Sequence, residues 1–497
     1  MEASSGSDVL SAPEAGAAAV RGGVLRVVTY LAGVVIAVGS AALLFNHLGL
    51  VDAGRYVLIL SVVALFGGLL DAGLSTIGLR ELAIRGGGDR DSLFRNMLGL
   101  RIALTGLGAL LACGWALVAG YETVLVFATA IAGVGLMLQN LQSAYATALM
   151  ADLRLGWVSL AEMLRQFTSV LAIVALVVAG SELLPFFLVA VIAGLAGLLL
   201  TLSRIRNVPL RPAFELPAWK ALLRQTLPFA LAVAVGSVYY RVAILLVELL
   251  SSETQTGYFG ASFRIVDVLL VVPQLVVSAA FPIFARAARD DRERLRHGLE
   301  RMLQACLLLG AGTAVLLFTG APFAIEVISL GKDEFDPAAE VLQIQGLALA
   351  ASFVAAVGSY GLLSIHAHRL VLTVNLVALA ICVALLVPLT LADGARGAAL
   401  ATLIAEVALA TGTLVALARA KGGLRLRVTR GPRILAAAVV AASVVLLGLP
   451  SVLAAALAGV VFSLLVVVLG AVPAEILEAV PDRLRPRRRR SRGGDSL

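Results

Sequence analysis

The stretch LPFALAVAVGSVYYRVAILLVELLSSETQTGYFGASFRIVDVLLVVPQLVVSAAFPIFAR, residues 227–286, decides the fold. It holds two apolar runs, each long enough for an α-helix that crosses a bilayer, joined by a short polar turn. Four charged residues interrupt these runs, namely Arg241, Glu248, Arg264 and Asp267. An ionised side chain at membrane depth is costly unless it faces a partner or a water-filled cavity, so each of the four is a candidate functional residue.

The spacing of these residues predicts two polar helix faces. Arg241 and Glu248 are seven positions apart and share a face of one helix, while Arg264, Asp267 and Gln274 form a stripe on the next helix. Two interpretations follow. The charges form internal salt bridges that hold the two helices together, or they line a cavity that receives an anionic substrate.

Composition sets the class of protein. Of 497 residues, 60% are hydrophobic and only 14% are charged, and the mean hydropathy is +0.99. Soluble domains carry about a quarter charged residues, so this is a polytopic membrane protein. The apolar runs are too long for the alternating strands of an outer-membrane barrel, which predicts an all-α fold. The cysteines, Cys113, Cys306 and Cys382, suggest no disulfide framework and no metal site, and we expect no cofactor.

Apolar runs of membrane-spanning length recur along the whole chain. We predict about fourteen transmembrane helices, at residues 24–45, 55–77, 99–119, 123–148, 157–179, 184–203, 225–250, 257–284, 302–319, 338–363, 370–391, 397–418, 433–449 and 451–472.

Basic residues predict the orientation. Arginines crowd into alternate loops, whereas the other loops hold only Arg55, Lys332 and Arg396. The positive-inside rule therefore places both termini in the cytoplasm, which agrees with an even number of spans. The arginine-rich segment 483–492 near the C-terminus is better explained by attraction to anionic lipid than by nucleic-acid binding.

A proline-containing loop divides the chain into two parallel six-span repeats. Gly54-Arg55-Tyr56, after the first span, has a counterpart in Gly257-Tyr258-Phe259, after the seventh. Repeats with the same orientation are related by an axis along the membrane normal, so the cavity is expected between them. The predicted parts are a disordered cytoplasmic tail (1–20), an N-lobe (21–206), a cytoplasmic linker (207–224), a C-lobe (225–418), a basic linker (419–432), a C-terminal helix pair (433–472) and a basic tail (473–497).

Several short runs carry a family resemblance between about residues 22 and 418. They are Leu48-Gly49-Leu50-Val51-Asp52-Ala53-Gly54-Arg55-Tyr56, Leu70-Asp71-Ala72-Gly73-Leu74-Ser75, Arg80-Glu81, Gly257-Tyr258-Phe259 with Arg264, Phe281-Pro282 with Arg286, Gly331 with Phe335, and Gly394-Ala395-Arg396-Gly397-Ala398-Ala399-Leu400-Ala401-Thr402 with Glu406. In order and spacing they resemble the bacterial polysaccharide (oligosaccharide) flippases of the multidrug/oligosaccharidyl-lipid/polysaccharide exporter superfamily.

The resemblance implies a V-shaped, two-lobed transporter in the bacterial cytoplasmic membrane. Such a protein moves undecaprenyl-pyrophosphate-linked sugar units from the inner to the outer leaflet, and it is no enzyme. Arg241 and Arg264 fall where similar proteins have cavity arginines. One departure is Ala243, where an acidic residue is common, which puts a role of that carboxylate in ion coupling in doubt.

Chemistry supports the same candidates. Arginine stays charged and donates in a bidentate fork to phosphate oxygens, which suits a pyrophosphate. We predict that Arg241 and Arg264 bind it. The ion-coupling candidates are Asp267, Glu406 and Asp71. The candidates for lining the sugar chamber are Glu248, Gln274, Glu162, Arg165, Gln139, Asn140, Gln343 and Asn375. Glu162 and Arg165, three positions apart, are equally consistent with a packing salt bridge.

Two other functions are considered. A multidrug and toxin extrusion antiporter would share the architecture, but organic cations favour a cavity with uncompensated carboxylates, and both central helices here carry arginine. A polysaccharide polymerase or ligase would need a large external loop, and the longest one expected here, about 320–337, is short. The expected partners are the lipid-linked glycan and membrane lipids, with a glycan polymerase or glycosyltransferases as further candidates. Nucleic acid is not expected.

Overall fold

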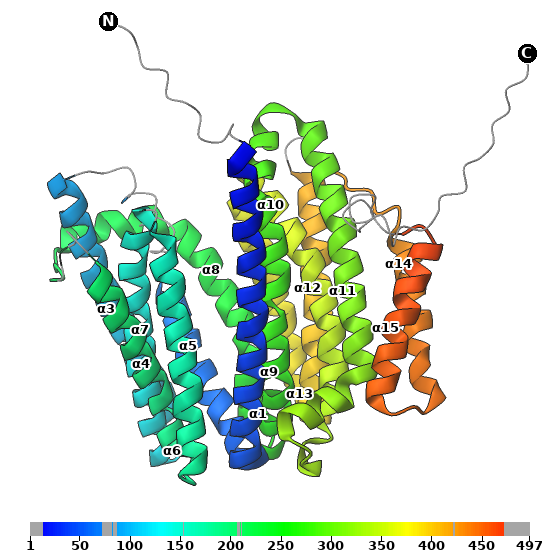
Figure 1. Ribbon diagram of the computed structural model, residues 1–497, viewed down its shortest axis with the longest axis horizontal. Coiled ribbons are helices and arrows are strands. Elements are labelled where there is room, and N and C mark those ends of the chain that lie inside the picture. The colour runs from blue at the N-terminus through cyan, green and yellow to red at the C-terminus, as the bar shows by residue number, and fades with distance from the viewer. Residues whose placement is uncertain are drawn as a thin grey trace, which may run out of the picture. The chain divides into compact units, whose positions relative to one another are not determined.

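The computed structural model describes residues 13–71, 82, 87–152, 154–205, 209, 211–420 and 423–471, and within these ranges every regular element is helical. The α-helices are α1 (Pro13–Asp71), α3 (Gly87–Val118), α4 (Thr123–Ala151), α5 (Leu155–Val178), α6 (Leu183–Phe186), α7 (Leu188–Arg204), α8 (Leu216–Leu250), α9 (Glu253–Leu269), α10 (Val271–Asp290), α11 (Arg292–Ser329), α12 (Ala338–Ser364), α13 (His368–Arg419), α14 (Gly431–Ala442) and α15 (Ser451–Val468) (Figure 1). Two short 3₁₀ helices are η1 (Asp333–Phe335) and η2 (Ser443–Leu447).

Length and hydropathy identify ten candidate membrane spans among the described helices. The protein is thus an all-α polytopic membrane protein, as predicted. The count of fourteen spans stays a prediction. Residues 13–20, within the predicted N-terminal tail, are helical, and their alanine-rich sequence has a high intrinsic helix propensity. The tail itself stays a prediction.

Two helices contain a break, each at a position predicted to lie between spans. A continuous helix of 59 residues would be about 88 Å long, far more than a hydrocarbon core of about 30 Å. In α1 the chain turns at Gly49, where φ is 77° and ψ is 177°. In α13 it turns at Asp393 and Gly394, where φ of Gly394 is 51°. Glycine adopts these conformations without the clash of a Cβ, so each long helix is a helical hairpin.

The described chain forms two compact units. The first contains the segments 1–268, 324–341 and 383–398, and the second contains 269–323, 342–382 and 399–497. These limits differ from the predicted lobes, whose boundaries stay a prediction.

In the first unit, α4 packs on α3 and α7, and α1 packs on α8 (Figure 1). Its core includes Phe94 and Tyr145, whose ring centroids are 5.6 Å apart. Glycines let α4 and α7 approach closely, since a Cβ on Gly135 would lie 2.7 Å from that of Ala190.

In the second unit, α14, η2 and α15 form an apolar hairpin (Figure 1). Ile434 and Phe462 of this hairpin share a core with Val315 of α11. The ring of Phe462 lies against Gly312, also in α11, where a Cβ would be 3.2 Å from it. The C-terminal helix pair is therefore packed on α11 through a small residue facing an aromatic ring.

Candidate functional site

The two candidate arginines lie in consecutive helices that are in contact. Arg241 is in α8 and Arg264 is in α9. The residue before each arginine makes the contact, since the rings of Tyr240 and Phe263 are 5.0 Å apart and tilted by 38°. The helices that carry the two arginines are thus in contact through Tyr240 and Phe263.

Two contacts join Arg241 to described residues, and neither partner is a carboxylate. Its guanidinium carbon lies 5.8 Å from the centroid of the Tyr240 ring, within the range of a cation–π interaction. Its Nη1 donates to Oγ of Ser61 on α1 over 3.4 Å, and Ser61 is almost fully buried. In the described part of the chain no ion pair involves Arg241. Among the described residues, the polar partner of the Arg241 guanidinium is therefore a neutral hydroxyl.

Arg264 has a weak partner in its own helix. Its Nη1 is 3.9 Å from Oδ2 of Asp267, and the two side chains are 37% and 32% exposed. A partly exposed ion pair at this distance contributes little to stability. Separating Asp267 from Arg264 therefore costs little free energy.

Glu248 does not pair with Arg241, although the two share a helix face in the sequence. Its Oε2 accepts a hydrogen bond of 3.0 Å from the Tyr121 hydroxyl. Burial, together with this carboxylate, raises the pKa of Tyr121, which keeps the hydroxyl a donor at neutral pH. Glu248 therefore links α8 to the connection between α3 and α4.

Glu162 and Arg165 are bound to each other within α5. Arg165 Nε donates to Glu162 Oε2 over 3.0 Å, and Nη2 is in close contact with Oε1. Gln166 Nε2 adds a bond of 3.4 Å to the same carboxylate. Of the two interpretations of this pair, the geometry favours the packing salt bridge.

The remaining polar candidates are dispersed. Asn140 Nδ2 donates to Thr105 Oγ1 over 3.1 Å, and Gln343 Nε2 donates to the Phe318 carbonyl over 3.0 Å. Both bonds join neighbouring helices and have a structural role. Three further side chains differ in exposure: Gln139 and Gln274 are exposed, and Asn375 is half-buried.

Glu406 and Asp71, the other two candidates for ion coupling, lie in segments distant in sequence from Arg241 and Arg264. Glu406, in α13, is half-buried and interacts electrostatically with Cys382. Asp71 ends α1, and its side chain lies outside the described residues. Within the described residues no cluster of three or more His, Cys, Asp or Glu side chains is arranged to hold a metal ion.

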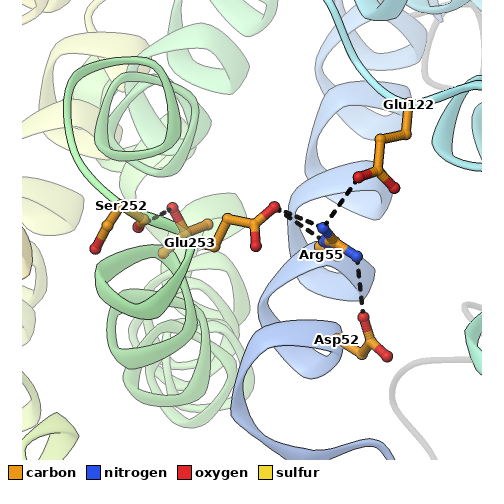
Figure 2. A network of polar contacts seen from close by, with 6 residues as sticks. Asp52, Arg55, Glu122, Ser252 and Glu253 are labelled. Carbon is orange, nitrogen blue, oxygen red and sulfur yellow. Dashed lines mark hydrogen bonds and ion pairs between the residues drawn. The ribbon is translucent and has the colours of Figure 1, made fainter.

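A network around Arg55 was missed by the reasoning from sequence. Arg55 Nη2 and Nε donate to Oε1 of Glu253 over 2.6 and 3.2 Å (Figure 2). The same guanidinium lies 3.4 Å from Oδ1 of Asp52 and 3.7 Å from Oε1 of Glu122. The available signal was that Arg55 is a rare cation in loops predicted to lie outside. The other two such cations, Lys332 and Arg396, are also in ion pairs.

Solved transporter structures share this fold. The lipid II flippase MurJ, in an inward closed conformation, has a TM-score of 0.69 and 13% identity, covering 88% of this chain and 98% of that one. An inward-facing multidrug resistance MATE family transporter of the MOP superfamily has a TM-score of 0.65 and 14% identity, covering 77% and 93%. A MOP superfamily transporter from Pyrococcus furiosus, described as having a binding pocket of reverse polarity, has a TM-score of 0.54 and 15% identity, covering 78% and 94%.

Sequence comparison assigns the family. No curated protein matches the chain significantly. A family model described as polysaccharide biosynthesis protein matches residues 31–333, which is more than half of the chain. The protein therefore belongs to the polysaccharide biosynthesis protein family, and it has the fold of the MOP-superfamily transporters.

Proposed function

We propose that the protein flips lipid-linked oligosaccharide or polysaccharide repeat units across the bacterial cytoplasmic membrane, from the inner to the outer leaflet. The family and the transporter fold support the class of substrate and the type of movement. The protein acts by alternating access and catalyses no covalent chemistry. Both termini lie in the cytoplasm, as the arginine distribution indicates.

The observation that carries this proposal is the state of Arg241. It is a cation in an apolar helix, and it has no ion pair among the described residues. Its neighbour Tyr240 contacts Phe263 in the helix that carries Arg264. A pyrophosphate fits two such arginines because each guanidinium donates in a fork to phosphate oxygens. An organic cation would be repelled, so the multidrug antiporter is the weaker alternative.

Asp267 has the role of a counter-ion in this scheme. It neutralises Arg264 in the absence of substrate and releases it when a phosphate arrives, because a pair at 3.9 Å is easily exchanged. A proton taken up by Asp267, or by Glu406, would couple this exchange to the proton gradient. A glycan polymerase or glycosyltransferases would act before or after the transport step.

The test is flipping in proteoliposomes that contain an undecaprenyl-pyrophosphate-linked glycan. We expect wild-type protein to transfer the glycan between leaflets, and Arg241→Ala and Arg264→Ala to reduce the rate to background. Arg369→Ala removes an exposed arginine elsewhere and serves as the control. A wild-type rate equal to that of empty liposomes overturns the proposal.

A further inference from the structure

The end of the first unit that is predicted to face outside is closed by contacts between the two predicted repeats. Three residues of the first repeat, Asn46, Leu50 and Arg55, each reach across. Asn46 Nδ2 donates to the Ser329 carbonyl over 3.0 Å. The Leu50 amide donates to Oε1 of Glu334 over 3.3 Å. Arg55 donates to Glu253.

These contacts follow the internal symmetry. The turn after span one reaches the connection between spans nine and ten, at Ser329 and Glu334. The end of span seven reaches the connection between spans three and four, where Tyr121 meets Glu248. Spans nine and ten of the second repeat correspond to spans three and four of the first. Paired contacts of this kind are expected where two parallel repeats meet around a shared axis.

The ion pairs of this closure all involve Arg55. Its three carboxylate partners do not come from the two repeats in equal number. Asp52 and Glu122 belong to the first repeat, as Arg55 does, whereas Glu253 belongs to the second (Figure 2). If the repeats separate, Arg55 keeps two carboxylates nearby. Glu253 is already 57% exposed and is solvated easily when it is released. Breaking the one pair strands no buried charge, which makes it reversible.

Apolar packing lies beside this pair. Gly54 and Gly257 meet directly, since a Cβ on Gly54 would lie 2.7 Å from the Gly257 Cα. The side chains of Leu50 and Val57 lie against Gly257 and Gly260 in the same contact. The Arg55–Glu253 pair is the charged part of this contact, and its loss leaves the apolar part in place.

We propose that Arg55 and Glu253 form the latch of an outer gate. The latch rests on the proposed function. It holds the outer ends of the two repeats together while substrate loads from the inside. The latch opens when the ion pair between Arg55 and Glu253 breaks, while Arg55 stays paired with Asp52 and Glu122. The space between the repeats is then open to the outside, and the glycan can leave.

The test is a cysteine placed just behind the latch. Val57 is buried and faces Gly260 across the same contact, so Val57→Cys is shielded while the gate is closed. It is introduced with Cys113, Cys306 and Cys382 replaced by alanine. Intact cells are then treated with a membrane-impermeant maleimide, and the labelling rate is measured.

Glu253→Gln and Arg55→Ala are expected to raise labelling about fivefold, the shift that loss of an ion pair of this exposure produces in a two-state equilibrium. Asp52→Asn is the matched control, because it removes a carboxylate from the same arginine within one repeat. Arg396→Ala is a second control, since Glu340 and Asp393, its partners, both lie in the second repeat. Neither control should change labelling.

Equal labelling in Glu253→Gln and Asp52→Asn overturns the latch, as does unchanged labelling in Arg55→Ala. The labelling rate is measured without added glycan and does not report transport, so the two proposals fail separately. Increased labelling with no flipping by the wild type would retain the latch and refute the flippase. Flipping by the wild type with unchanged labelling in Glu253→Gln would do the reverse.

Discussion

Gly54 of α1 and Gly257 of α9 touch backbone to backbone, and they are equivalent positions of the two predicted repeats. A Cβ on Gly54 would be 2.7 Å from the Gly257 Cα and 2.8 Å from its amide nitrogen. Residues on an axis that relates two repeats meet their own equivalents. The contact therefore supports the parallel repeat inferred from Gly54-Arg55-Tyr56 and Gly257-Tyr258-Phe259.

Gly54→Ala should destabilise the protein, because the new methyl group meets backbone, which cannot rotate away. Overpacking of this kind typically costs about 1–3 kcal/mol. The measurement is the thermal unfolding midpoint of purified protein in detergent. Gly114→Ala in α3 is the matched control, since nothing lies within 4 Å of its Cβ, and alanine favours a helix. Equal midpoints for the two variants would contradict the packing described.

The sequence was sufficient for the helical class and for the positions of the two hairpin turns. Gly49 and Gly394 lie between predicted spans, and both adopt positive φ. The partners of the charges were harder to predict. Helical periodicity shows that Arg241 and Glu248 share a face, but it does not show which helix lies opposite. Tyr121, the partner of Glu248, is 127 residues away and carries no charge to indicate it.

The same limit applies to Arg55. Its position in a loop region with few cations was visible in the sequence, whereas Glu253, 198 residues away, became its partner only through the meeting of α1 and α9. Pairs within one helix were predictable, because three positions along a helix bring side chains together. Glu162–Arg165 and Arg264–Asp267 are two examples.

Arg165→Gln should lower the amount of inserted protein, because it leaves Glu162 as an unpaired charge in an apolar helix. Glu162→Gln with Arg165→Gln should restore most of the loss, since no charge is left. Quantitative blotting of membranes measures both. If the double variant is inserted in as small an amount as Arg165→Gln, the pair has a role beyond neutralising the charge of Glu162.

The predicted orientation is tested by reporter fusions. Fusions after Ala53, Tyr121, Ser252 and Asp336 should report the outer side, and fusions after Asp89, Leu210, Asp290 and Gly422 the cytoplasm. The fusion after Ser252 is the critical one, because it lies in the second repeat at the turn equivalent to the one after span one. A cytoplasmic signal there would refute parallel repeats.

Coupling to protons is tested at Asp267 and Glu406. Asp267→Asn should alter the pH dependence of flipping and leave glycan binding largely intact, because Arg264 keeps its charge and loses only an intramolecular competitor. Glu406→Gln tests the other candidate in the same assay. If both variants keep the wild-type pH profile, neither carboxylate is the coupling site.

The last prediction distinguishes two contributions of Arg241 to phosphate binding, namely its positive charge and the planar fork of its guanidinium. Arg241→Ala should abolish flipping, and Arg241→Lys should restore only part of it, because an ammonium is a point charge that lacks the planar fork of a guanidinium. The structure adds a condition on abundance. Arg241 contacts Ser61 and Tyr240, and no carboxylate pairs with it among the described residues, so its removal deprives no described carboxylate of an ion pair. Both variants should be inserted at wild-type levels, unlike Arg165→Gln. Normal flipping by a stably inserted Arg241→Ala would refute the role of this arginine, and a loss of protein would indicate a structural role instead.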